Sequence, residues 1–90
     1  MIKALVSVDG QDRTGIIAAV TTELSRQNIN ILEISQTIMN GFFTMLMVVD
    51  LQNAKADFKA TAKALSNVGK GMDVEISIRR MDIFEAMHRI

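Results

Sequence analysis

The sequence predicts an α+β fold in which two helices cover one face of a four-stranded antiparallel sheet. In four stretches apolar residues alternate with polar ones, which is the period of strands. In two other stretches they recur every three to four residues, which is the period of amphipathic helices. The hydrophobic content of 49% is enough for a packed core, and residues 1–90 are expected to form a single domain.

A short polar loop separates the first strand from the first helix. Residues 2–9 alternate and predict a strand. The loop Gly10–Thr14 follows, and helical spacing begins at Gly15. We expect Thr14 or Asp12 to cap this helix by accepting hydrogen bonds from its first free amides.

A hairpin follows the first helix. The helix is expected to end near Gln27-Asn28, because asparagine tolerates the left-handed conformation. Residues 31–39 predict a strand, and Asn40-Gly41 is a strong signal for a two-residue turn. The returning strand, residues 42–50, is apolar on both faces, so we expect both faces to be covered.

The last third of the chain repeats the helix-then-strand order. A helix is predicted over residues 54–68, with Asn53 as its N-cap and Val68–Gly71 as its end. Residues 72–80 alternate and predict the fourth strand. The tail, residues 82–90, begins with a capping-box pattern and predicts a short helix.

The resulting order, β-α-β-β-α-β, predicts the ferredoxin-like sandwich plus a short C-terminal helix. Right-handed crossovers put the first and third strands in the middle of the sheet. The sheet face without helices is half apolar, and we expect a second copy to pack there or on a sheet edge. That face is expected to carry Leu5, Ser7, Ser35, Thr37 and one of the pair Phe42 and Phe43.

The composition argues against several classes of function. Ten basic and ten acidic residues cancel, so bulk charge offers no basis for nucleic-acid binding. The chain has no cysteine, which excludes disulfides, thiolate metal sites and a cysteine nucleophile. Its N-terminal apolar run is too short for a signal peptide or a membrane span, so we expect a cytoplasmic protein without a membrane partner.

The groupings of side chains that nucleophilic catalysis or a metal site would need are also missing. The single histidine, His88, lies near the end of the chain without a carboxylate partner to orient it. No cluster of residues has metal-ligand spacing, and the seven methionines fit a role as core filler. Phe42 and Phe43 lack the basic neighbours of an RNA-binding surface. We therefore expect no enzyme activity, no metal, no cofactor and no nucleic-acid partner.

The polar loop after the first strand is the one candidate site. Free amides at a helix start carry partial positive charge and suit a carboxylate. Asp9 or Asp12 can accept from an ammonium group, Arg13 can offer a second carboxylate contact or remain solvated, and Gly15 permits close approach. These are the contacts that a free amino acid needs. The alternative is an ordinary polar turn in which Gly10 and Gly15 serve only the geometry.

The same residues resemble the ACT domain family. The telling pieces are Asp12-Arg13-Thr14-Gly15-Ile16 before the first helix and Asn28-Ile29-Asn30-Ile31 at the entry to the second strand. Further runs resemble small stand-alone ACT proteins of unassigned role: Ile34–Thr37, Phe42–Met45 and Ile83–Met87. The resemblance covers essentially the whole chain.

The resemblance implies a regulatory module that pairs with a copy of itself and binds an amino acid or related small molecule at the interface. It matches Gly15 to the family's turn glycine and Asn28 and Asn30 to the segment that faces the ligand. The candidate ligand-binding residues are therefore Asp9, Gly10, Asp12, Arg13, Thr14, Gly15, Ile16, Asn28, Asn30 and Ile31. We expect no enzyme or transcription factor to be attached to this module, so any signal should pass to a separate protein target.

Two other functions are compatible with this fold. One is an adaptor that recognises a protein through a sheet edge or the open sheet face, without a small ligand. The other is a small hydrolase of the acylphosphatase kind, which needs an arginine in a phosphate-cradling loop and an asparagine that positions water. Arg13 and Asn40 do not have the spacing for that chemistry.

Overall fold

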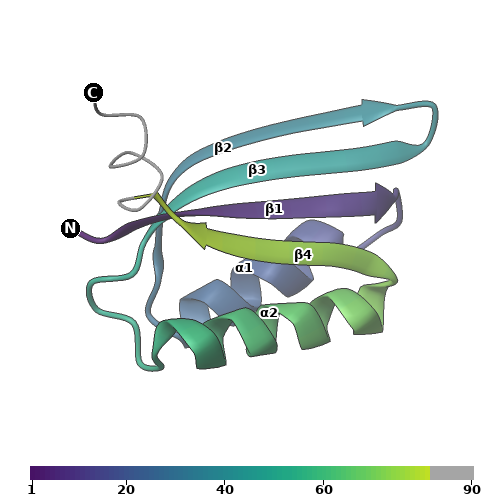
Figure 1. Ribbon diagram of the computed structural model, residues 1–90. Helices are drawn as coiled ribbons and strands as arrows, with labels where there is room; N and C mark the ends of the chain where they lie inside the picture. Colours follow the sequence, from purple (N-terminus) through teal and green to yellow (C-terminus); the bar gives the residue numbers. More distant parts are fainter. Residues whose placement is uncertain (82–90) are drawn as a thin grey trace.

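A computed structural model describes residues 1–81 and confirms the β-α-β-β-α-β order (Figure 1). The helix predicted over residues 82–90 lies outside the described residues. The elements are β1 (Lys3–Gln11), α1 (Ile16–Arg26), β2 (Asn30–Met39), β3 (Phe42–Asp50), α2 (Phe58–Met72) and β4 (Val74–Arg80).

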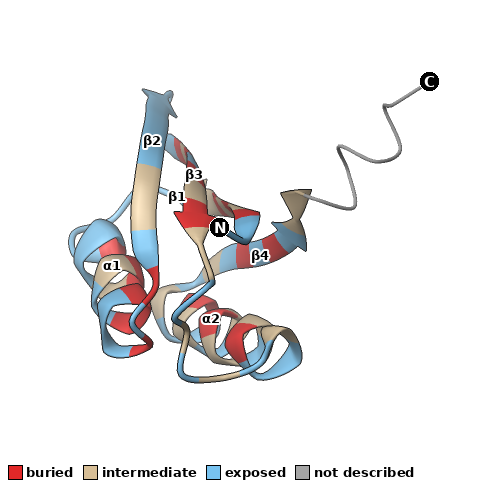
Figure 2. Cartoon of the chain, turned by 90° about the vertical axis from the view of Figure 1, so that its left-hand side faces the viewer, coloured by how far each residue is buried: buried red, intermediate tan, exposed pale blue. Residues whose placement is uncertain are grey.

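The four strands form one antiparallel sheet in the order β2-β3-β1-β4, so the prediction that the first and third strands lie in the middle is confirmed. Both helices lie on one face of the sheet (Figure 1). Viewed end on, α1 lies on the side of β2 and α2 on the side of β4 (Figure 2). One side of the molecule is therefore built from the edge strand β2 and helix α1.

The core fills the space between the sheet and the helices. Every second residue of β1 and β3 points into it, which explains why Phe43 is buried and Phe42, its neighbour, is 53% exposed. The buried apolar residues are Ala4, Val6, Val8, Ile16, Val20, Leu24, Ile29, Phe43, Met45, Met47, Val49, Leu65, Ile76 and Ile78. Burial of a side chain such as that of Phe43 contributes about 2–3 kcal/mol to folding.

Both predicted helix N-caps are wrong. At α1 the N-cap is Gly15, at φ 95°, and no side chain caps the helix. The left-handed turn at Gly15 replaces the side-chain cap that we expected from Thr14 or Asp12. Helix α2 begins at Phe58 rather than at residue 54, because Asp57 accepts a 2.8 Å hydrogen bond from the Ala60 amide.

The predicted end of α2 at its glycines is also wrong, because the helix continues to Met72. Gly69 does not end the helix; a glycine is needed there because β4 packs closely against it. A Cβ atom at Gly69 would lie 2.6 Å from the carbonyl oxygen of Val74, at the start of β4. The glycine therefore allows helix and strand to approach closely, and Asp73, at φ 57°, reverses the chain between them.

The predicted turn at Asn40-Gly41 is confirmed, with positive φ at both residues. Strand β2 differs from its simple alternating pattern, because the pairing with β3 shifts between Ile31 and Glu33. All of β2 from Glu33 onwards is exposed (Figure 2).

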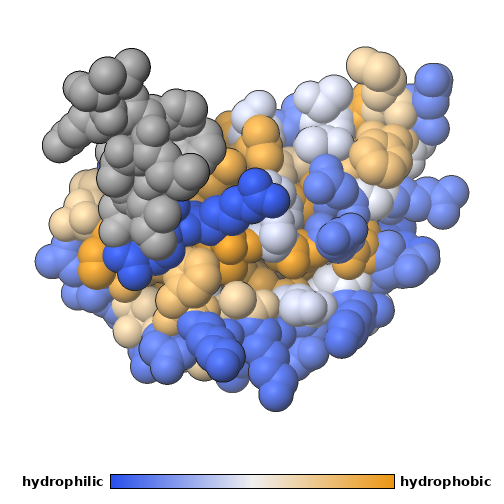
Figure 3. All heavy atoms as spheres, in the orientation of Figure 1, coloured by the Kyte–Doolittle hydropathy of each residue, from blue (hydrophilic) through white to orange (hydrophobic). Residues whose placement is uncertain are grey.

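Within residues 1–81, only one face of the third strand is covered. Its inward face is buried, but Phe42 and Leu46 on the other face are exposed. Apolar side chains accordingly gather across the sheet and near the β2–β3 turn (Figure 3). The covering that we expected is not supplied by residues 1–81 and stays a prediction.

Candidate ligand-binding site

The turn between β1 and α1 is held by the backbone. The Asp12 amide donates a 2.8 Å hydrogen bond to the Gly41 carbonyl, which ties the turn to the β2–β3 hairpin. Among the described residues, no protein group accepts a hydrogen bond from the Thr14 or Gly15 amide. These amides stand at the positive end of the helix dipole, so their chemistry suits a carboxylate.

Arg13 lies beside the end of α2. Its Nη2 atom is 3.6 Å from a carboxylate oxygen of Asp73, and both side chains are largely exposed. An exposed pair of this kind contributes little to stability. Arg13 is therefore loosely held and can turn toward a bound anion at small cost.

Asp9 and Gly10 lie where β1 pairs with β4, and not in the turn before α1. Asp9 lies opposite Glu75 in the sheet and borders a cleft between α2 and β4. A Cβ atom at Gly10 would lie 2.7 Å from Cγ1 of Val74, so the glycine permits close packing of the strands. Residues 12–16 line none of four clefts on the described surface.

The remaining candidates lie at the other end of α1. Asn28, Asn30 and Ile31 border a cleft of about 370 Å³. Helix α1 has 11 residues, and a helix of that length spans about 16 Å. The structure thus divides the predicted site into two groups: the turn group, Asp12–Ile16, and the asparagine group, Asn28, Asn30 and Ile31.

Two hydrogen bonds fasten the loop 51–57 across the end of α1. Asn28, in the left-handed conformation at φ 60°, donates from Nδ2 to the Asn53 carbonyl at 3.1 Å. The Lys55 amide donates to the Gln27 carbonyl at 2.9 Å. The predicted left-handed asparagine is confirmed, and it holds one wall of the cleft in place.

Sequence reasoning missed four residues that line this cleft: Thr21, Ser25, Ile29 and Asn53. Thr21 and Ser25 are four residues apart and Asn28 follows three later, so their common stripe on a helix was visible in the sequence. The position of Asn53 was not visible, because it depends on how the loop 51–57 crosses the helix.

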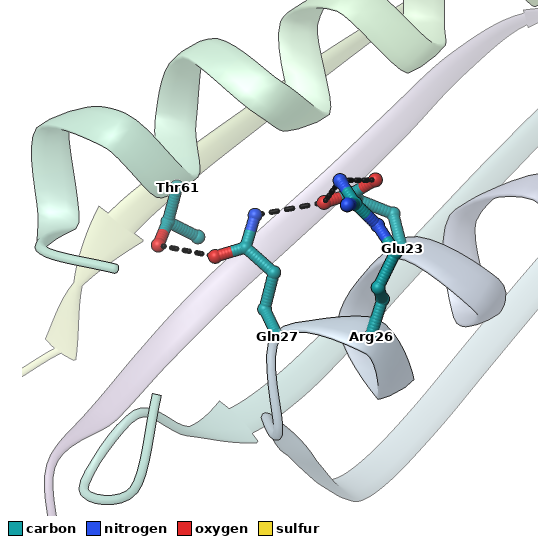
Figure 4. A network of polar contacts seen from close by, with 4 residues as sticks. All are labelled: Glu23, Arg26, Gln27 and Thr61. Atoms are coloured by element: carbon teal, nitrogen blue, oxygen red, sulfur yellow. Dashed lines mark hydrogen bonds and ion pairs between the residues drawn. The ribbon is translucent and has the colours of Figure 1, made fainter. Parts of the chain in front are cut away.

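A buried polar network joins the two helices (Figure 4). Glu23 is only 8% exposed, and its two carboxylate oxygens accept 3.0 Å bonds from Arg26. Gln27 donates to the same carboxylate at 2.7 Å and accepts from Thr61 of α2 at 3.4 Å. The hydrogen bond from Gln27, with a further contribution from Arg26, lowers the pKa of Glu23 despite the opposing effect of burial. The hydrogen bond between Gln27 and Thr61 thus joins the end of α1 to α2.

Within residues 1–81, no three histidine, cysteine, aspartate or glutamate side chains are grouped to hold a metal ion. Neither helix in that range is both long and apolar enough to cross a bilayer.

Comparison with known proteins agrees with the architecture. The sequence model of the ACT domain family matches residues 3–79. A UPF0237 protein of Methanocaldococcus jannaschii is 49% identical over 90 residues, the full length of both chains. An ACT domain protein from Streptococcus pneumoniae has a TM-score of 0.83 at 36% identity, over 93% of this chain and 94% of that one. The ligand-free regulatory subunit of aspartate kinase from Thermus thermophilus shares the fold, with a TM-score of 0.66 at 24% identity, over 87% of this chain and 50% of that one. The chain therefore belongs to the ACT domain family.

Proposed function

We propose that this protein is a non-enzymatic regulatory module that binds an amino acid or a similar small metabolite between two copies of itself. Membership of the ACT family supports the regulatory role, since the same fold occurs in a regulatory subunit of aspartate kinase. The observation that carries the proposal is the division of the candidate residues between the two ends of α1. A cytoplasmic location stays a prediction from the sequence.

A two-fold axis would reunite these two groups. If α1 of one copy runs antiparallel to α1 of its partner, each turn group faces the asparagine group of the other copy. The ligand would then touch both chains. In such an arrangement, each site would be completed by residues of both chains.

The side of the molecule formed by α1 and β2 suits this contact. Strand β2 is a ten-residue sheet edge with Glu33 as its only charged residue and without proline. Edges so poorly protected are prone to pair with another strand. Ile17 of α1 and Ile34 and Ile38 of β2 are exposed, and pairing with an identical surface would remove apolar area from water.

The electrostatics of the paired helices favour a zwitterion. The Thr14 and Gly15 amides, at the positive end of one α1, can donate to a carboxylate. The side-chain oxygens of Asn28 and Asn30, at the negative end of the partner's α1, can accept from an ammonium group. Asp12 offers a further acceptor, whereas Asp9 borders the separate α2–β4 cleft.

Because the ligand would bind the pair and not the separated chains, it would shift the population toward dimer. A protein target that distinguishes dimer from monomer would then read the metabolite concentration. The output needs no catalytic group, which agrees with a chain that has no cysteine and whose only histidine is His88.

Calorimetry and thermal melting with a set of amino acids test the proposal. We expect at least one of them to bind and raise the melting temperature, and Gly15→Leu to abolish binding by blocking the turn. Gly41→Leu is the matched control, because it imposes the same left-handed strain, at φ 77°, where nothing lies within 4 Å of the added Cβ. Absence of binding by every amino acid, or equal loss in both variants, would contradict the proposal.

The exposed sheet face favours a second candidate function, a protein adaptor. Met39, Phe42 and Leu46 are exposed on or beside this face. If the adaptor is the correct function, Phe42→Ser would prevent capture of a protein target, whereas Gly15→Leu would leave it intact. The opposite pattern would favour the metabolite sensor.

A further inference from the structure

We propose that the cleft at the C-terminal end of α1 selects the ligand by its side chain and that it prefers a carboxamide, as in asparagine or glutamine. This inference rests on the proposed function and adds to it the chemical class of the ligand. The cleft has about 370 Å³, which falls within the range of small-molecule sites.

The lining of the cleft is polar and carries no charge. It combines two hydroxyl groups and three amide side chains with two isoleucines. The lining residues are Thr21, Ser25, Asn28, Ile29, Asn30, Ile31 and Asn53. A carboxylate side chain placed here would lose water without gaining an opposite charge, which is costly. The lining, at the negative end of the α1 dipole, therefore disfavours aspartate and glutamate side chains.

The hydrogen-bonding capacity left in the cleft includes both donors and acceptors. Thr21 donates its hydroxyl to the Ile17 carbonyl at 2.8 Å, so its oxygen remains an acceptor. The side chains of Ser25 and Asn53 make no hydrogen bond to a described protein group. A carboxamide has two N–H donors and a carbonyl acceptor, whereas a carboxylate only accepts and an ammonium only donates. The carboxamide is the best match.

The nearest charged pair does not alter this balance. Arg26 borders an adjoining hollow, which shares Thr21, Ser25 and Ile31 with the cleft. Its Nη2 group is directed to both oxygens of Glu23 at 3.0 Å, so the two charges compensate each other. The electrostatic environment next to the cleft is therefore close to neutral.

The cleft is also fixed in shape before any ligand arrives. The hydrogen bond from Asn28 to the Asn53 carbonyl and the bond from Lys55 to the Gln27 carbonyl hold the loop against the helix end. Fixed groups lose little conformational entropy on binding, which sharpens selectivity. In the proposed pair, the ligand's backbone zwitterion would bridge the two chains while its side chain enters this cleft.

Titration calorimetry with amino acids of four classes tests the inference: carboxamide, hydroxyl, charged and apolar side chains. We expect glutamine or asparagine to bind at least about tenfold more tightly than glutamate or aspartate, since one mismatched hydrogen bond corresponds to about that factor. Hydroxyl side chains should fall between the two, because they donate and accept only once each in a typical geometry.

Two variants locate the selectivity. Ser25→Ala and Asn53→Leu should each weaken glutamine binding by about three- to tenfold and leave leucine binding unchanged. Both residues are exposed, and Asn53→Leu retains the backbone carbonyl that Asn28 uses, so both variants should fold. Gln52→Leu is the matched control, because it makes a similar change at the adjacent residue, outside the cleft.

The outcomes separate the inference from the proposed function. Binding that favours charged or apolar amino acids would overturn the inference and leave the sensor intact. A carboxamide preference that survives both Ser25→Ala and Asn53→Leu would also overturn it, because the selectivity would then arise elsewhere. Absence of binding by all four classes would overturn the sensor and the inference together.

Discussion

The two edges of the sheet are protected to different degrees. Strand β4 has seven residues, carries Glu75, Arg79 and Arg80, and lies close against α2 through Gly69. Strand β2 has ten residues, one charge, and exposed isoleucines at 34 and 38. Charges and a covering helix are common means of preventing strand addition at an edge. The contrast indicates that β4 closes the fold, whereas β2 is the edge suited to contact with another chain.

Closing the β4 edge depends on close helix–strand packing, so the largest expected effect is at Gly69. We predict that Gly69→Leu lowers the free energy of unfolding by about 3 kcal/mol, because the new side chain overlaps the start of β4. Chemical denaturation measures this loss. Gly71→Ala, also in α2 but with open space around the added Cβ, should be neutral or slightly stabilising. Equal destabilisation by Gly71→Ala would contradict the assignment of the loss at Gly69 to packing against β4.

At the β2 edge, the expected effect is on assembly and not on folding. We predict that Ile38→Lys weakens the proposed dimer by about a hundredfold, since it would place a charge in the desolvated interface proposed at β2. The unfolding free energy of the monomer should change by no more than about 0.5 kcal/mol, because Ile38 is 54% exposed in the single chain. Sedimentation analysis measures the first quantity and denaturation of the diluted protein the second.

A charge on the other edge serves as the control for the β2 variant. Ser77→Lys introduces a lysine at an exposed position of β4. If Ser77→Lys dissociates the dimer while Ile38→Lys does not, the assignment of the interface to β2 is wrong.

The polar network of Glu23, Arg26, Gln27 and Thr61 joins α1, on the β2 side, to α2, on the β4 side. Removing its central carboxylate should give the smallest loss of stability among these variants. The pKa of Glu23 is lower in the folded chain, so its stabilising contribution is present above its unfolded-state pKa and is lost as the pH falls through the folded-state pKa. We predict that Glu23→Gln lowers the free energy of unfolding by about 1 kcal/mol at neutral pH. The unfolding free energy of this variant should also decrease less on acidification than that of the original protein.

Denaturation curves at a series of acidic pH values measure the contribution of Glu23. Asp50 acts in the same direction, because hydrogen bonds from the Gln52 and Ile2 amides lower its pKa. Some acid sensitivity should therefore persist in Glu23→Gln. The exposed Glu75 provides the control, and a Glu75→Gln curve that is as flat as that of Glu23→Gln would contradict the role of the network.

Local patterns were sufficient for most of the architecture. Alternation and helical spacing depend on residues within one element, so all four strands, both helices and the Asn40-Gly41 turn were predictable. The helix boundaries were less predictable. Gly15 caps α1 by its left-handed conformation, and Gly69 remains inside α2 because β4 lies against it. Neither fact follows from the residue type alone.

The candidate site divides in the same way. The sequence by itself determined its chemistry: free amides before a helix and asparagines after it. Only the tertiary structure decided that these groups lie at opposite ends of α1 and that Asn53, 25 residues beyond Asn28, completes the second one. The reason is physical: residue types set which bonds are possible, whereas packing of distant segments sets which groups meet.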